Sequence, residues 1–354
     1  MTYKIKRIVS VLCLVAAIFS ATLLPVSGYC ETLRFVFLAD SRGTSTSDLI
    51  NTAALTAINT KILKLSPRPS FVVFGGDQAY RGYSNGAYNF QAFKNAMKAL
   101  TNAGIKLYTV LGNHELYVKG QDGFFLSNQK EFQNEFSDNP TNGPSGYGRL
   151  VYSFASPGGD AFFAVLDAYY LTTDILNPNL HGNVDDTQRT WLASQLAQTK
   201  ATHKFLFIHP PYYSVTEAQS SQNTSYTNLW SILDNNSFDI YCCGHVHLYS
   251  RKTIDSSIAP NPQLSPPVQW KNNVVQLLNG TCGAPVDTSP LTVDRSLWHV
   301  FNGAHTHYFS VVDINGSNVT VNSYSGGTSD YNVIDSFTIN KNALPGVDLL
   351  LDRR

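Results

Sequence analysis

The feature that most constrains the fold is a series of six apolar segments, each of which runs into an Asp, Asn or His at or near its end. They are residues 33–40 (LRFVFLAD), 70–77 (SFVVFGGD), 105–115 (IKLYTVLGNHE), 161–167 (AFFAVLD), 203–210 (HKFLFIHP) and 238–247 (FDIYCCGHVH). Continuous apolar character over this length favours strands that are covered on both faces. Because sites in open α/β sheets form beyond the carboxyl ends of the strands, the pattern predicts an α/β fold with a polar site there.

Helical spacing of apolar residues predicts three helices between these strands, over residues 47–64, 87–101 and 186–199. Asp186 or Thr187 is expected to cap the last of them. After residue 270 the segments become shorter and alternate, with Asn-Gly and Gly-Ser turns between them, which predicts a second, antiparallel sheet. No linker divides these segments, so we expect one domain over residues 31–340 and a C-terminal tail over 341–354.

The N-terminus has the layout of a secretory signal peptide. Lys4, Lys6 and Arg7 precede an apolar run from Ile8 to Leu24, and small residues follow. We expect cleavage after this segment, residues 1–30, and a periplasmic or secreted protein without membrane association. An uncleaved anchor is the alternative, because the run is only slightly shorter than the roughly 20 residues that span a bilayer.

Charge and cysteine content bear on nucleic-acid binding and on disulfide formation. The chain has 25 basic and 25 acidic residues, and loss of the three N-terminal cations leaves a mildly acidic protein without a basic run. Affinity for nucleic acid through phosphate neutralisation is therefore not expected. An exported protein can pair Cys242 or Cys243 with Cys282, while free buried thiols are equally compatible with the sequence.

The polar residues at the ends of the apolar segments form a candidate metal-binding set. Carboxylates, an amide and imidazoles without cysteine ligands suit a catalytic Zn, Fe or Mn centre. There are enough of them for two metals bridged by one carboxylate; the set comprises Asp40, Asp77, Asn113, His209, His245 and His247. Asp167, at the end of another segment, is expected to order the site loops instead.

The motifs that carry these residues resemble those of the calcineurin-like metallophosphoesterases. FLADSRG, GGDQAY, LGNHE, FIHPP and GHVHLYSR occur in that family's order, and GDxxY, GNHE and GHVHxYxR are most similar to its purple acid phosphatase branch. The resemblance covers residues 33–325 and implies a four-layer α/β/β/α sandwich. It also implies a phosphohydrolase that acts on small phosphate monoesters through metal-activated hydroxide. A phosphodiesterase or nucleotide hydrolase on the same centre is the alternative, and a non-catalytic binding module is a third.

The resemblance also implies a role for each residue. Asp40, Asp77, Tyr80 and His247 would bind one metal, and Asp77, Asn113, His209 and His245 the other, with Asp77 as the bridge. A phenolate ligand at Tyr80 favours Fe(III) beside a divalent Fe, Zn or Mn, and two divalent ions are the alternative. His114 would protonate the leaving alkoxide, or else be a structural histidine.

The sequence departs from the family pattern at Arg42, where the resembled branch usually has Gly and the wider superfamily His. A protonated Arg cannot bind a metal, so Arg42 is expected either to clamp a phosphate oxygen or to form a structural salt bridge. The family's further substrate histidines are not evident after His209. Residues 116–150 are expected to form a lip over the site that selects the substrate.

Overall fold

The computed structural model describes residues 32–213, 215, 224–257, 269–288, 298–301, 306–327 and 330–342. The predicted signal peptide and most of the predicted tail lie outside these ranges, so both stay predictions. The described residues from Thr32 onward form one compact unit. Within the described ranges, no helix has the length and apolar character needed to cross a membrane.

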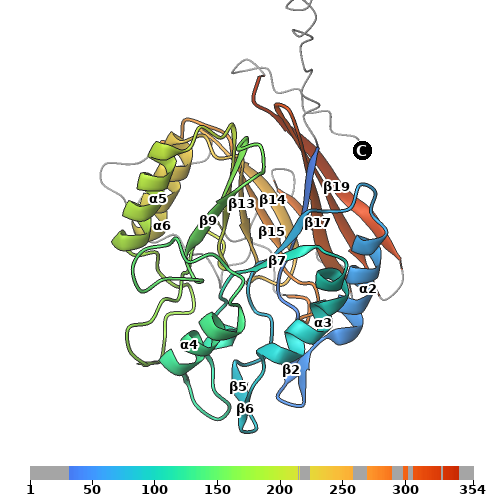
Figure 1. The fold of residues 1–354 in the computed structure, drawn as a ribbon, viewed down its shortest axis with the longest axis vertical. Coiled ribbons are helices and arrows are strands. Elements are labelled where there is room, and N and C mark those ends of the chain that lie inside the picture. Colours follow the sequence, from blue (N-terminus) through green and yellow to red (C-terminus); the bar gives the residue numbers. More distant parts are fainter. Residues whose placement is uncertain are drawn as a thin grey trace, which may run out of the picture. The chain divides into compact units, whose positions relative to one another are not determined.

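All six apolar segments form strands, as predicted, and they divide between two sheets (Figure 1). Three strands pair in parallel in the first sheet: β1 (Leu33–Leu38), β4 (Phe71–Phe74) and β7 (Lys106–Thr109). Three more pair in parallel in the second: β10 (Ala161–Val165), β12 (His203–Phe207) and β13 (Ile240–Cys243).

The strands after residue 270 do not form a sheet of their own, so that prediction was wrong. β17 (His307–Asn315), β18 (Asn318–Gly326) and β19 (Tyr331–Asn340) extend the first sheet in the order β19-β18-β17-β1-β4-β7. β15 (Val274–Asn279) and β16 (His299–Phe301) extend the second sheet together with the earlier strand β14 (Tyr249–Ile254). The order of this sheet is β16-β14-β15-β13-β12-β10-β9, and it ends on β9 (Tyr152–Ala155). Alternating polarity indicates a half-buried strand, but it does not specify the partner strand.

The two sheets pack face to face through aromatic side chains. In β1, Phe35 and Phe37 point between the sheets, while Val36 and Leu38 point to the outer face, and all four are buried. The Phe35 ring centroid lies 5.5 Å from that of Phe163 and 5.3 Å from that of Phe205, both in the second sheet. These contacts hold the carboxyl ends of both sets of parallel strands near one another.

Helices cover the outer faces, which completes the predicted four-layer α/β/β/α sandwich. Figure 1 shows α2 (Thr52–Leu63) and α3 (Phe90–Asn102) beside the first sheet, and α5 (Asp186–Gln198) and α6 (Thr224–Asn235) beside the second. The cap of α5 is Asp185, whose side chain accepts a hydrogen bond from the Gln188 amide, and not Asp186 or Thr187 as expected. Cys242, Cys243 and Cys282 are free, buried thiols.

Short elements follow the carboxyl ends of the parallel strands. β2 (Arg42–Ser45) pairs with β3 (Asp48–Ile50), β5 (Tyr83–Ser84) with β6 (Ala87–Tyr88), and β8 (Gly123–Phe124) with β11 (Ile175–Leu176). A 3₁₀ turn, η1 (His114–Leu116), and helix α4 (Leu126–Glu135) complete this region. The candidate site lies among these connections.

Candidate metal centre

Three candidate ligands have an unfavourable backbone conformation that the surrounding structure must stabilise. Asp40, Asp77 and His245 have φ angles of 62°, 54° and 71°, in the left-handed region that non-glycine residues rarely occupy. Each such residue costs about 1–3 kcal/mol, and such residues cluster at functional sites. The turns are joined to one another, because the Asp40 amide donates to the Gly76 carbonyl at 3.0 Å and the His245 amide donates to the Asp40 carboxylate.

The first group of candidate ligands is Asp40, Asp77 and His247. One ligand atom from each lies within 4.8 Å of the other two, so this group could hold a metal ion. His247 Nε2 is 3.6 Å from Asp40 Oδ1, and its Nδ1 donates to the Pro285 carbonyl at 2.8 Å. That outer hydrogen bond fixes the tautomer and leaves Nε2 free to bind, which is the usual arrangement of a metal-binding histidine.

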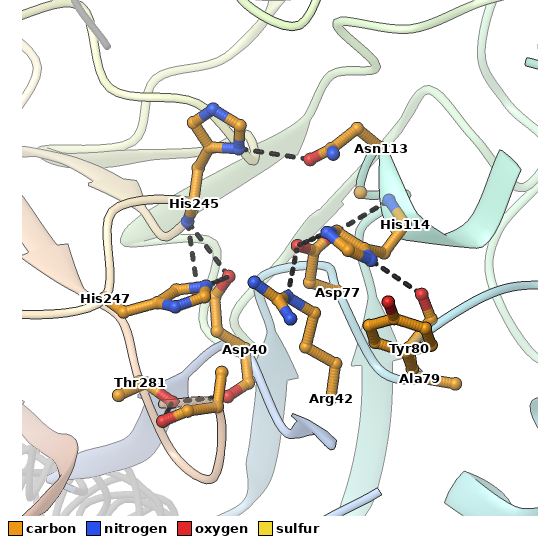
Figure 2. A network of polar contacts seen from close by, with 12 residues as sticks. Asp40, Arg42, Asp77, Ala79, Tyr80, Asn113, His114, His245, His247 and Thr281 are labelled. Atoms are coloured by element: carbon orange, nitrogen blue, oxygen red, sulfur yellow. Dashed lines mark hydrogen bonds and ion pairs between the residues drawn. The ribbon is translucent and has the colours of Figure 1, made fainter. Parts of the chain in front are cut away.

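The second group adds His209, His245 and Asn113. His209 Nε2 lies 3.3 Å from Asp77 Oδ1 and 4.0 Å from Asp40 Oδ1, while its Nδ1 donates to the Gly75 carbonyl at 2.7 Å. The Nδ1 of His245 and the amide oxygen of Asn113 face each other at 3.1 Å (Figure 2). Asp77 and Asp40 both lie near His209, with Asp77 the nearer of the two, so the bridging role of Asp77 stays a prediction.

The charged groups of this cluster favour a bound cation. Burial opposes charge on His209, but the charge of Asp77, a contact with its carboxylate, and the charge of Asp40 outweigh it and raise the pKa of His209 to about 9. Burial likewise opposes charge on Asp77, yet the neighbouring His209, His114 and Arg42 hold its pKa well below the usual range. Burial and the charge of His209 lower the pKa of His245, so that imidazole is neutral and available as a ligand.

The residues present therefore fit the metal ions that the motifs imply. His209 Nε2 is buried and lacks an aligned hydrogen-bond partner in the part of the chain that the structure describes, although two carboxylates lie near it. One imidazole nitrogen thus lies within 4.0 Å of two carboxylates, and a divalent or trivalent ion is a ligand-sharing partner that suits all three groups.

Glycines keep the ligand turns close together. A Cβ at Gly76, which has a φ of 96°, would meet the His209 ring, and one at Gly112 would meet Asp77. Any larger residue at either position would push a candidate ligand out of place.

His114 and Arg42 face Asp77 from the side. His114 Nδ1 donates to the Tyr80 carbonyl at 2.6 Å, and its Nε2 lies 3.9 Å from Asp77 Oδ2. Burial, opposed by the charge of Asp77, lowers the pKa of His114 to about 4. Figure 2 shows Arg42 reaching between Asp40 and Asp77; its Nε is 3.7 Å from Asp77 Oδ2 and is buried without a hydrogen-bond partner among the residues described. Tyr80 is half-buried, with its ring centroid 5.9 Å from that of His114.

Glu115 is a residue of the site to which sequence reasoning gave no role. It is completely buried, and its carboxylate accepts hydrogen bonds from the backbone amides of Asp77 and Gly112 at 2.8 Å and of Ala79 at 3.3 Å. Burial and the charge of Asp77 raise the pKa of Glu115. Its side chain joins the turn after β4 to the turn after β7. The signal in the sequence was an acidic residue within an apolar stretch, directly after Asn113 and His114.

Asp167 and the end of the last motif have structural contacts. Asp167 accepts a hydrogen bond from the Tyr169 amide at 2.7 Å, which fits the expectation that it orders a site loop. Tyr249 and Arg251, in the GHVHLYSR motif, both donate to Asp335 of β19, at 2.7 and 2.6 Å. These bonds tie the second sheet to the first.

The candidate ligands open into a cavity of about 610 Å³. Besides Arg42, Asp77, Asn113, His114, His245 and His247, it is lined by residues 178–181 and 285–288. The expected lip from residues 116–150 contributes none of the lining residues, although Phe124 and Tyr147 line a neighbouring cavity. Residues 178–181 are far from most candidate ligands in the sequence, so their place beside the cavity could not be predicted.

A four-layer α/β/β/α sandwich with carboxylates, an amide and histidines at the carboxyl ends of its strands defines a metallophosphoesterase fold. The family model of the calcineurin-like phosphoesterases matches residues 33–249, more than half of the chain. The chain therefore belongs to the calcineurin-like phosphoesterase family.

Solved structures share this fold at low sequence identity. A purple acid phosphatase from yellow lupin (Lupinus luteus) seeds has a TM-score of 0.61 and 18% identity over 88% of this chain. GAP50, the anchor in the inner membrane complex of Plasmodium, has a TM-score of 0.57 and 18% identity over 87% of this chain and 89% of its own. A dimetal phosphatase from Danio rerio has a TM-score of 0.53 and 14% identity over 85% and 98%.

The chain spans 54% of the length of the lupin protein. A comparison with curated proteins finds no significant match.

Proposed function

We propose that this protein is an exported, dinuclear-metal phosphohydrolase that acts on small phosphate monoesters. The observation that carries the proposal is the convergence of His209 on Asp77 and Asp40, with His245, His247 and Asn113 around the same carboxylates. In this proposal Asp40, Asp77, Tyr80 and His247 hold one ion, and Asp77, Asn113, His209 and His245 hold the other. When bound, the two ions supply Lewis-acid activation of water and of the phosphate oxygens.

Arg42 is proposed to bind the phosphate group. Its guanidinium lies at the wall of the cavity, and its Nε has no hydrogen-bond partner within the described ranges, so it is available to an anionic ligand. Guanidinium binds phosphate oxygens through paired hydrogen bonds, which would orient the ester and offset its charge. The 3.7 Å contact with Asp77 also supports the structural alternative.

His114 is proposed to donate the proton to the leaving oxygen. The hydrogen bond to the Tyr80 carbonyl fixes the ring, so that Nε2 faces the cavity side of Asp77. A proton on Nε2 can pass to the alkoxide as its bond to phosphorus breaks. Because the pKa of His114 is lowered to about 4, Nε2 would carry this proton mainly at acidic pH.

Tyr80 is the residue that bears on metal identity. A phenolate is an anionic oxygen ligand, and loss of its proton, which has a pKa near 10, is best compensated by a trivalent ion. Iron(III) beside a divalent Fe, Zn or Mn is therefore proposed, with two divalent ions as the alternative. The resemblance of the GDxxY motif to the purple acid phosphatase branch supports this choice.

Two other functions have support. The open cavity of about 610 Å³ is large enough for a diester or a nucleotide, so a phosphodiesterase or nucleotide hydrolase on the same centre is the second candidate. A non-catalytic binding protein is the third, because GAP50, an anchor, has the same fold. The intact set of candidate ligands favours an enzyme over this last alternative.

One experiment tests the proposal directly. The protein, purified from its exported form, should contain two metal ions per chain by elemental analysis and should hydrolyse p-nitrophenyl phosphate faster than bis(p-nitrophenyl) phosphate. A preference for the diester would replace the proposal with its second candidate. A metal-free, inactive protein that regains no activity with Fe, Zn or Mn would favour the binding protein.

A further inference from the structure

We propose that a second cavity, beside the metal centre, is a subsite for the leaving group and binds a flat, uncharged ring. This cavity has a volume of about 430 Å³, and its lining includes Phe124, Tyr147, Tyr170, Ile175, Asn179 and Asp185. The inference rests on the proposed function, since it assumes a phosphate ester bound at the metal centre. It deepens that function by naming the alcohol that the ester carries.

The two cavities open on either side of one segment. Pro178 and Asn179 line both of them, so an ester with its phosphate at Arg42 and His114 can extend across this segment. The segment is anchored: the Asn183 amide donates to the Ala168 carbonyl at 2.7 Å. Gly182, with a φ of 68°, packs so closely on Ala168 that a Cβ would lie 2.6 Å from its carbonyl oxygen. The boundary between the cavities is therefore formed before a ligand arrives.

Two tyrosines give the second cavity an aromatic wall. The rings of Tyr147 and Tyr170 stack with centroids 3.7 Å apart and an interplanar angle of 19°. The Tyr147 hydroxyl donates to Asp185 Oδ2 at 3.0 Å, which holds this buried ring in place against the half-buried Tyr170. Fixed aromatic rings are platforms for stacking of planar groups, with little loss of side-chain freedom on binding.

Exposed apolar side chains mark the path between the cavities. Ile175, Leu176 and Leu180 are 41%, 70% and 44% exposed, and they belong to the segment that separates the two cavities. Ile175 lines the second cavity and Leu180 the first. Apolar side chains exposed together on a soluble protein commonly mark a binding site, and these would contact an apolar ring and its linker.

The polar groups of the second cavity select an uncharged ring. Exposed amides of Asn179 and Asn183 offer donors and acceptors, whereas the Asp185 carboxylate repels a second anionic group. An alcohol that carries a flat ring, either a nucleoside or an aryl alcohol, has this chemistry. A polyol such as glycerol has no ring to stack.

The test compares kcat/KM for three esters: adenosine 5′-monophosphate, p-nitrophenyl phosphate and glycerol 2-phosphate. Tyr170→Ala should lower the ratio of ring ester to glycerol ester by roughly tenfold, the loss expected from one stacking contact. Tyr170→Phe, which keeps the ring, should retain the ratio. Tyr88→Ala, an exposed tyrosine that lines neither cavity, serves as the control. A larger loss on the adenosine ester identifies a nucleoside as the ring, and a larger loss on the aryl ester identifies an aryl alcohol.

Binding of free adenosine and of phenol, measured by saturation-transfer NMR, separates this inference from the proposed function. Binding that Tyr170→Ala weakens supports the subsite even if no ester is hydrolysed, an outcome that would refute the phosphohydrolase alone. Hydrolysis of all three esters with an unchanged ratio, together with no binding of either ring, would overturn the subsite and leave the phosphohydrolase intact.

Discussion

His209 Nε2 lies 3.3 Å from Asp77 Oδ1, while the opposite nitrogen of the same ring donates to the Gly75 carbonyl. The histidine comes from the second sheet and the aspartate from the first, so this contact joins the two layers at the candidate centre. Without a cation, the pair is held by a proton on His209, whose pKa is raised to about 9. A metal ion would take the place of that proton.

The bridging role of Asp77 predicts the strongest single effect. Asp77→Asn should lose both metals and nearly all hydrolysis, because an amide oxygen cannot supply the charge shared by two ions. The buried strand β4 before it is unchanged, so the variant should still fold. Metal analysis and circular dichroism check both points, with the exposed Asp160→Asn as the control for loss of one charge. Two metals with near-normal turnover in the Asp77 variant would remove Asp77 from the centre.

Tyr80 and Tyr117 form a matched pair for testing iron ligation. Their ring centroids lie 5.9 and 5.6 Å from that of His114, and Arg81 lies over both rings. If Tyr80 binds Fe(III), protein purified aerobically with iron should be pink to violet. Tyr80→Phe should then bleach the colour, and Tyr117→Phe should keep it. Absorption spectra decide the matter, and a colourless, fully active enzyme with two divalent ions would exclude the tyrosinate.

The proposed acid role of His114 predicts an effect that depends on the leaving group. His114→Ala should keep its metals and lose about 10²–10⁴-fold in rate on alkyl phosphates, whose alkoxides need a proton. Activated aryl phosphates should lose much less, because their phenolates leave without one. Steady-state kinetics over a series of esters measures the difference. An equal loss on every ester would indicate that His114 positions the substrate instead.

Asp335 predicts a pH dependence of stability that is separate from the metal centre. Burial opposes its charge, but hydrogen bonds from Arg251 and Tyr249 and the charges of Arg251 and His299 lower its pKa. A carboxyl group whose pKa is lower in the folded protein stabilises it above the unfolded pKa of about 3.9, and this contribution is lost as the pH falls through the folded value.

Asp335→Asn should therefore lower the free energy of unfolding at pH 7 and flatten its decline below about pH 4. Urea unfolding of the variant and the parent at several pH values measures both. The exposed Asp330→Asn is the control, and the same slope in variant and parent would show that Asp335 does not couple folding to pH.

Much of the fold was predictable because buried parallel strands have a local signature. Each of the six apolar segments, from Leu33–Leu38 to Ile240–Cys243, became a strand, and the helical spacing located α3 and α5 to within three residues. The helix predicted over 47–64 begins only at Thr52, because residues 48–50 pair as strand β3 instead. The candidate ligands could be identified for the same reason, since all but Tyr80 lie two to four residues after the end of a strand. Local sequence patterns were therefore enough to predict the strands, most of the helices between them and the candidate chemical groups.

Which strands share a sheet and which side chains meet depend on the packing of the folded chain. β17–β19 join β1, and β15 joins β13, because pairing between distant strands depends on packing of the whole domain and leaves no local pattern. Three features of the site join segments that are far apart in the chain. The Glu115 carboxylate accepts hydrogen bonds from two ligand turns, Arg42 lies between two aspartates, and residues 178–181 line the cavity. Residue type fixes what each group can do, but distance and burial, which set its charge and its partners, exist only once the two sheets have packed together.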